Sequence, residues 1–87
     1  MAWLDNLRDA EGRAFVRTRL KRVEQGNLGD VRSVGDGVHE LKIDKGPGYR
    51  VYFGQDSDLV VLLLGGDKDS QQRDIAKDKE YWTDYNA

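Results

Sequence analysis

Apolar residues in the first 25 positions recur at helical spacing. The residues that form the two apolar stripes are Trp3, Leu4 and Leu7, then Val16, Leu20 and Val23. Steps of three or four residues place side chains on one face of a helix. The pattern predicts two helices, over residues 3–9 and 12–25, that form a hairpin and end before Gly26.

From residue 31 onward the apolar period changes to two, which is typical of strands. The alternation predicts strands over residues 31–34, 38–44, 49–53 and 59–64. In the second strand His39, Leu41 and Ile43 point to one face. The last strand is apolar at every position, which favours a place in the interior of the sheet.

A charged helix is predicted after the strands, over residues 71–83, with Ser70 as its N-cap and Ile75 and Trp82 as apolar anchors. Two helices, an antiparallel meander and a final helix indicate an α+β fold. We expect one domain, residues 1–87, with the helical hairpin covering one face of the sheet. The residues on the opposite, uncovered face are Glu40, Lys42, Arg50 and Tyr52.

Composition excludes several classes of protein. The 87 residues include no cysteine and one histidine, so disulfide scaffolds, thiolate metal sites and His-rich metal sites are excluded. No apolar run approaches the roughly 18–20 residues that span a bilayer, and the first residues lack the sections of a secretory signal. We therefore expect a cytoplasmic protein without metal or cofactor. The net charge of −2 argues mildly against nonspecific nucleic-acid binding, although residues 1–22 are basic.

Lys42 and Arg50 lie on adjacent strands and, by parity, on one side of the sheet. Glu40 between them would make an ordinary cross-strand salt bridge. The alternative is a phosphate clamp, in which Tyr52 stacks on a base or donates a hydrogen bond. Lys68, between the last strand and the last helix, suits an anion site, but a solvated charged loop is equally compatible.

Five blocks of the sequence resemble the RelE/ParE toxin superfamily, and within it the HigB-like branch of phage-derived addiction module killer proteins. The blocks are residues 3–7, 26–31, 35–43, 46–53 and 65–75. They occur in the family's order and spacing, and the resemblance extends over residues 3–82. Gly46-Pro47-Gly48-Tyr49-Arg50 and Gly65-Gly66-Asp67-Lys68 are the most specific.

The resemblance implies a toxin of a type II toxin–antitoxin pair, neutralised by a protein antitoxin of the helix-turn-helix type. Related toxins cleave mRNA on the ribosome without a metal, by attack of the RNA 2′-hydroxyl on the adjacent phosphate. Carried over by position, Arg50, Lys42 and Lys68 would be catalytic. Arg73, Tyr52 and Glu40 would bind substrate.

Two alternatives remain open. A ParE-like protein would inhibit DNA gyrase without chemistry of its own, and a truncated, inactive toxin would only bind its antitoxin. Members of the superfamily begin with a strand before the Trp-Leu-Asp block, and this chain starts nearly at that block. The resemblance therefore implies that one sheet edge is open, covered by the C-terminal tail, or paired with another chain as in a homodimer.

Overall fold

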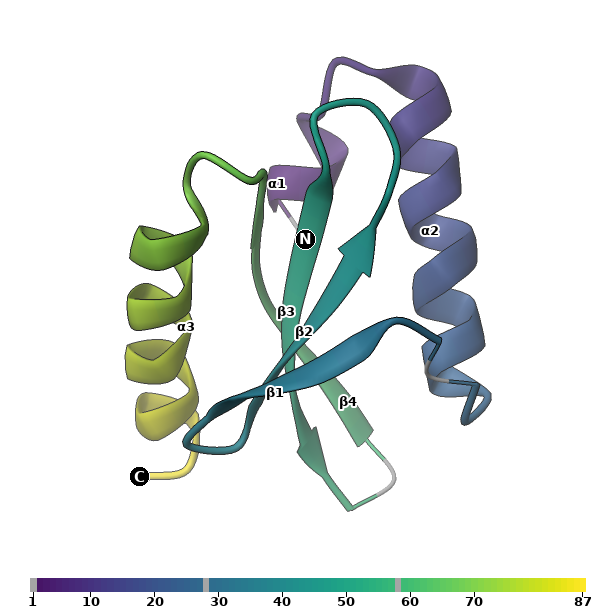
Figure 1. The fold of residues 1–87 in the computed structure, drawn as a ribbon. Helices are drawn as coiled ribbons and strands as arrows, with labels where there is room; N and C mark the ends of the chain where they lie inside the picture. Colours follow the sequence, from purple (N-terminus) through teal and green to yellow (C-terminus); the bar gives the residue numbers. More distant parts are fainter. Residues whose placement is uncertain (1, 28, 58) are drawn as a thin grey trace.

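A four-stranded antiparallel sheet lies between helices in the computed structural model, which describes residues 2–27, 29–57 and 59–87 (Figure 1). The elements are α1 (Ala2–Asp5), α2 (Ala10–Glu24), β1 (Val31–Gly35), β2 (Val38–Ile43), β3 (Tyr49–Asp56), β4 (Leu59–Gly66) and α3 (Gln71–Tyr85). The predicted α+β class and the order of the elements are confirmed. No described helix is both long and apolar enough to cross a membrane.

The first helix of the predicted hairpin is shorter than expected. It ends at Asp5, and α2 begins two residues earlier than predicted. Asp9 determines this start, because its Oδ1 accepts a hydrogen bond from the Gly12 amide at 3.0 Å. The Tyr49 hydroxyl donates to the other Asp9 oxygen at 3.1 Å, which joins the start of α2 to the start of β3.

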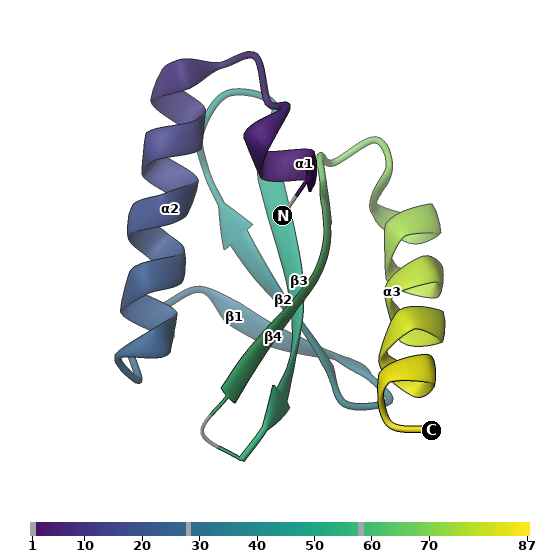
Figure 2. The same cartoon turned by 180° about the vertical axis from the view of Figure 1, so that it is seen from behind.

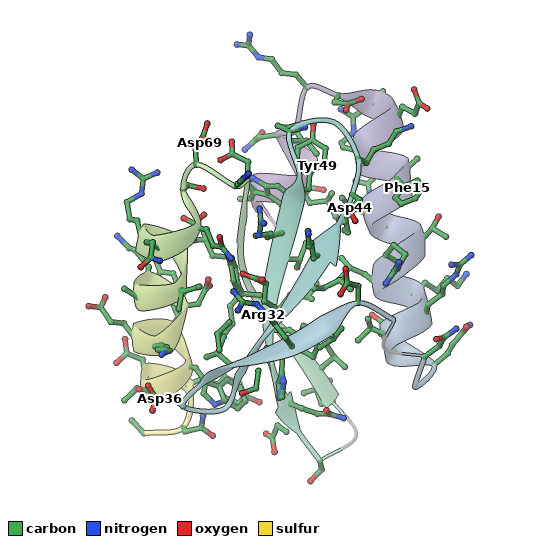
Figure 3. The ribbon with its side chains drawn as sticks, in the orientation of Figure 1. Phe15, Arg32, Asp36, Asp44, Tyr49 and Asp69 are labelled. Atoms are coloured by element: carbon green, nitrogen blue, oxygen red, sulfur yellow. The ribbon has the colours of Figure 1, made fainter. Side chains whose placement is uncertain are left out.

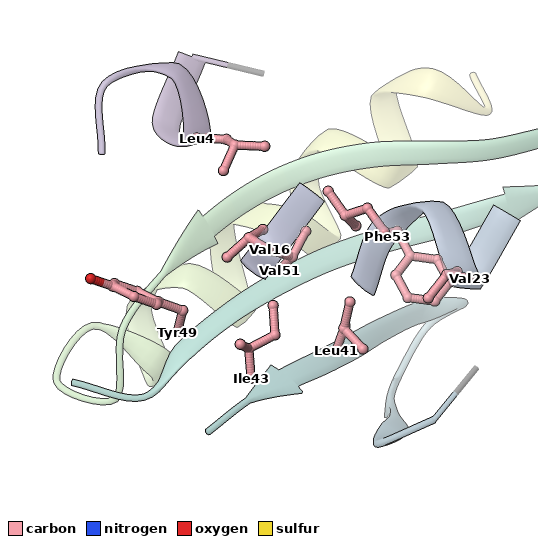
Figure 4. Packing of buried hydrophobic residues seen from close by; sticks show 9 residues of the cluster. Leu4, Val16, Val23, Leu41, Ile43, Tyr49, Val51 and Phe53 are labelled. Atoms are coloured by element: carbon pink, nitrogen blue, oxygen red, sulfur yellow. The ribbon is translucent and has the colours of Figure 1, made fainter. Parts of the chain in front are cut away.

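The helices α1 and α2 cover one face of the sheet with the larger apolar core. Its buried members are Leu4, Val16, Leu20, Val23, Leu41, Ile43, Tyr49, Val51 and Phe53. Figure 4 shows the valines of α2 meeting the side chains of β2 and β3. His39 belongs to this face, as its parity predicts, and its ring stacks on Phe53 with 5.4 Å between centroids.

The opposite face of the sheet is not uncovered, as the sequence had suggested, because α3 packs across it (Figures 1 and 2). Trp82 is buried there with Val38 and Tyr52. Gly54 makes this possible, since a Cβ at that position would lie only 2.3 Å from the Trp82 ring. The absence of a side chain at Gly54 on β3 thus leaves room for the Trp82 ring of α3 to pack against the sheet.

The strand order is β1-β2-β3-β4, so β4 is an edge strand and its predicted interior position is wrong. Its sequence is apolar on both faces because helices cover both faces of the sheet. Val60 packs with the α1/α2 side, whereas Val61 and Leu63 pack with the α3 side. A strand that is apolar at every position therefore indicates that both of its faces are covered. It does not indicate that strands flank it on both sides.

Gly65→Ala is expected to destabilise the protein by about 1–3 kcal/mol, the range for forcing an extra methyl into a packed site. A Cβ at Gly65 would lie 2.1 Å from the Trp3 ring, so α1 would have to move away from β4. Urea unfolding followed by tryptophan fluorescence measures the loss. An unchanged midpoint would contradict the packing of Trp3 on β4.

Candidate functional site

Polar side chains form two neighbouring rows across the sheet on the side of α3. Arg32 on β1 pairs in register with Glu40 on β2, which pairs with Tyr52 on β3. In the next row Lys42 pairs with Arg50. Figure 3 shows Arg32 over the middle of the sheet. The meander therefore brings three cations and one carboxylate together, because all four share one face.

A cleft of about 300 Å³ opens over these rows, between β1, β2, β3 and the first turn of α3. Its lining residues are Asp30, Arg32, Glu40, Lys42, Arg50 and Gln71. Three of the six are basic and two are acidic, so the lining has a net positive charge although the whole chain is acidic.

Glu40 is the buried centre of a hydrogen-bond network, with only 2% of its surface exposed. Arg32 Nε donates to Oε1 at 2.9 Å, and Gln71 Nε2 donates to Oε2 at 2.8 Å. The Tyr52 hydroxyl also donates to Oε2, at 3.1 Å. Burial would raise the pKa of Glu40, but these donors outweigh it and lower that pKa. Glu40 is therefore an ionised acceptor.

Glu40 does not join Lys42 to Arg50 as a simple cross-strand salt bridge. Its Oε2 lies 3.9 Å from Arg50 Nε, which is too long for a hydrogen bond. Lys42 pairs with Asp44 instead, at 3.6 Å, and 44% of its side chain is exposed. The strongest charged partner of Glu40 is Arg32, which the sequence analysis did not single out.

Arg50 is buried in the cleft wall with part of its donor capacity unused. Its Nη1 donates to the Gly48 carbonyl at 3.1 Å. Its Nε is buried and has no hydrogen-bond partner among residues 2–27, 29–57 and 59–87. A buried donor without a partner costs free energy, and an anionic ligand in the cleft would remove that cost.

The other predicted site residues lie at different distances from the cleft. Lys68 is exposed in the turn before α3, and a Cβ built on Gly48 would be 4.0 Å from the Lys68 Cβ and 3.7 Å from Arg50 Nη1. Lys68 therefore borders the Arg50 end of the cleft without lining it. Arg73 is exposed on α3 and does not line the cleft either.

Tyr52 does not lie on an exposed face of the sheet, where the sequence analysis expects it. It is fully buried, so its ring has no exposed surface on which a base could stack. The reason is α3, whose Trp82 packs with Tyr52 in one cluster. Burial raises the pKa of the Tyr52 hydroxyl, and the negative charge of Glu40 adds to this effect. Tyr52 thus remains a protonated donor that positions Glu40.

No group of three or more histidine, cysteine, aspartate or glutamate side chains in the described part of the chain is arranged to hold a metal ion. The charges that the cleft presents to a ligand are those of its own arginine, lysine and acidic residues.

The helix α3 buries two carboxylates of its own, Asp74 and Asp78. Asp78 has no exposed surface, and neither of its oxygens has a hydrogen-bond partner within the described residues. Burial raises the pKa of Asp78 to about 7. The Leu64 backbone N–H, although its geometry falls short of a hydrogen bond, lowers the pKa of Asp78 against this shift, and repulsion from Asp74 has a smaller effect that raises it.

Asp78 makes folding depend on pH in an identifiable window. Its pKa is higher in the folded protein, about 7, than its ordinary value of 3.8, so the folded state binds more protons between these values. The free energy of unfolding should therefore decrease as pH rises from about 4 to about 7. Asp78→Asn should remove this slope in urea titrations, whereas Asp84→Asn, at an exposed position of α3, should keep it.

A comparison with known proteins finds a relative in Haemophilus influenzae that carries the name "Uncharacterized protein". It is 48% identical to this chain over 79 residues, which are 90% of this chain and 80% of the relative. No family model matches the chain. No solved structure matches it.

Proposed function

Since this chain belongs to one family with the Haemophilus influenzae protein, whose name specifies no activity, we propose a function from the chemistry of the cleft. The protein is a RelE-like toxin that cleaves mRNA on the ribosome. The observation that carries the proposal is Arg50, a buried guanidinium in a cleft that also holds Lys42 and Arg32. Its Nε lies 3.9 Å from Glu40 Oε2 and makes no hydrogen bond to any residue that the structure describes. Such donors suit an RNA phosphate.

The proposed reaction breaks one phosphodiester bond. The 2′-oxygen of a ribose loses its proton to solvent and attacks the adjacent phosphorus. The bond from phosphorus to the 5′-oxygen breaks, which leaves a 2′,3′-cyclic phosphate and a 5′-hydroxyl. Arg50 stabilises the charge that develops on the phosphate oxygens. Lys42, which is half exposed at the cleft, donates the proton that the leaving 5′-oxygen takes up.

Glu40 has a supporting role in this scheme. Its oxygens accept hydrogen bonds from Arg32, Gln71 and Tyr52, so it orients groups around the cleft instead of touching the reacting atoms. Its charge also reduces the repulsion among the three cations before RNA enters.

The spatial arrangement of the toxin-like blocks supports the proposal. The Gly48-Tyr49-Arg50 block and the turn with Lys68 are separate in the sequence, yet they adjoin at Gly48. A protein antitoxin, of the helix-turn-helix type, would be the natural partner of such a toxin. The ribosome would present the mRNA.

Expression in a bacterial host tests the proposal. Wild-type protein should arrest growth and fragment mRNA, while Lys42→Ala, a change at a half-exposed residue, should relieve both effects without unfolding the protein. Growth arrest with intact mRNA and an induced DNA-damage response would instead identify a gyrase inhibitor. No arrest by the folded protein would identify an inactive toxin.

A further inference from the structure

The cleft contains two positively charged regions, which the carboxylate of Glu40 separates. Its Oε1 accepts the hydrogen bond from Arg32 Nε at 2.9 Å, and its Oε2 lies 3.9 Å from Arg50 Nε. The two guanidinium groups therefore both turn their Nε toward Glu40. A single phosphate that contacted both arginines would lie against the negative charge of Glu40, and like charges at short range repel. The arginines are thus placed for two anions and not for one.

The two regions lie at different depths. The side chain of Arg50 is 9% exposed, and Arg50 pairs in register with Lys42. The side chain of Arg32, on the edge strand β1, is 62% exposed. Arg50 therefore lies deep in the cleft, whereas Arg32 lies at its mouth, where a longer ligand would enter.

Arg32 is both held in place and free to bind. Its hydrogen bond to Glu40 uses one of the five N–H donors of a guanidinium, so the group is oriented while other donors can reach a ligand. Both arginines approach the same carboxylate, so their guanidinium groups are only one carboxylate apart. Successive phosphates of an RNA strand are separated by one ribose, which is a group of comparable size.

We propose that the cleft binds two successive phosphates of one RNA strand. Arg50 and Lys42 act on the phosphate that reacts, and Arg32 binds the phosphate next to it along the strand. The choice of RNA rests on the proposed function, whereas the division into two anion positions rests on the geometry around Glu40. Arg32 is then a substrate-binding residue that sets the register of the strand. Its loss weakens binding and leaves the maximal rate of cleavage unchanged.

Binding of uncleavable trinucleotides to the full chain tests the proposal without any cleavage. The parent probe is a 2′-O-methyl trinucleotide, which has two phosphates and no 2′-hydroxyl that could attack. Two neutralised probes carry an uncharged methylphosphonate in place of one phosphate or the other. In NMR titrations at low salt, wild type should bind each neutralised probe about tenfold more weakly than the parent, the effect of losing one charge-assisted hydrogen bond.

Arg32→Gln separates binding from structure, because the glutamine amide can still donate to Glu40. The variant should bind the parent probe about tenfold more weakly than wild type, and it should bind at least one neutralised probe as well as the parent. The slope of log K against log salt concentration should become shallower by about 0.7, the contribution of one phosphate contact to a single strand. Arg22→Ala removes an exposed arginine of α2 and is the matched control, with wild-type binding of all three probes. Circular dichroism verifies that each variant is folded.

The binding results decide the proposal separately from the proposed nuclease activity. Wild type that binds either neutralised probe as tightly as the parent, or that binds none of the probes, would overturn the two-phosphate site. An Arg32→Gln variant that still prefers the parent tenfold over both neutralised probes would overturn it as well. The expected discrimination without any cleavage on ribosomes would support the two-phosphate site and contradict the nuclease alone.

Cleavage on programmed ribosomes adds a kinetic readout that a structural role of Arg32 would not produce. Arg32→Gln should raise the protein concentration that gives half-maximal cleavage about tenfold and keep the maximal rate of wild type. A lower maximal rate with an unchanged half-maximal concentration would place Arg32 at the reacting phosphate, against the proposal.

Discussion

Arg50→Ala is expected to lower the rate of RNA cleavage about 100- to 1,000-fold, the effect of removing one preorganised donor to a developing negative charge. Arg50 lines the cleft, and its buried Nε makes no hydrogen bond within residues 2–27, 29–57 and 59–87, since the Glu40 carboxylate lies 3.9 Å away. The variant should fold, because Glu40 keeps its hydrogen bonds from Arg32, Gln71 and Tyr52. Single-turnover cleavage on programmed ribosomes measures the rate.

Two further variants give the Arg50 experiment its controls. Arg22→Ala removes an exposed arginine from α2, on the other side of the sheet, and should cleave at the wild-type rate. Arg50→Lys keeps the positive charge but loses the planar fork of donors, so it should restore only part of the rate. Equal rates for Arg50→Ala and Arg22→Ala would mean that the cleft is not the site of chemistry.

Glu40→Ala is expected to destabilise the protein by about 3–5 kcal/mol, the cost of removing one partner from a buried ionic network. The Tyr52 hydroxyl and Arg50 would remain buried without their carboxylate. This loss is a large part of the 5–15 kcal/mol that stabilises a typical domain. Urea unfolding measures it, with Glu80→Ala on the exposed side of α3 as the matched control. Equal losses in the two variants would contradict the network.

The Glu40 network also has a pH signature. Because its pKa is lowered in the folded protein, Glu40 contributes stability above its ordinary pKa of 4.5 and loses that contribution as pH falls through the folded value. The difference in unfolding free energy between wild type and Glu40→Ala should therefore shrink below about pH 4. Asp78 changes stability in the opposite direction, between about pH 4 and about pH 7.

Local pattern was enough to predict most of the elements. The apolar spacing in residues 12–25 defines one face of a helix, and the alternation in residues 38–44 defines one face of a strand. Both patterns depend only on residues close together in the sequence. The position of α3 depends on a match between distant residues. Trp82 fits over Gly54, and a single sequence does not show which strand receives a helix anchor.

The candidate site was predictable where strand parity decides it. Parity alone placed Lys42 beside Arg50, and the register confirms this pair. The same reasoning applied to β1 would have found Arg32, which lies opposite Glu40. Gln71 was not predictable, because its contact with Glu40 depends on how α3 docks. For the same reason the sequence did not indicate that Tyr52 is buried.

Mapping of mRNA 5′ ends in a reconstituted translation reaction with the purified protein tests directly whether the cleft cleaves RNA. We expect new ends at codons in the ribosomal A site, present only with ribosomes and absent with Arg50→Ala. Intact mRNA with a folded wild-type sample, or identical ends with Arg50→Ala, would contradict the assignment of this cleft to RNA cleavage.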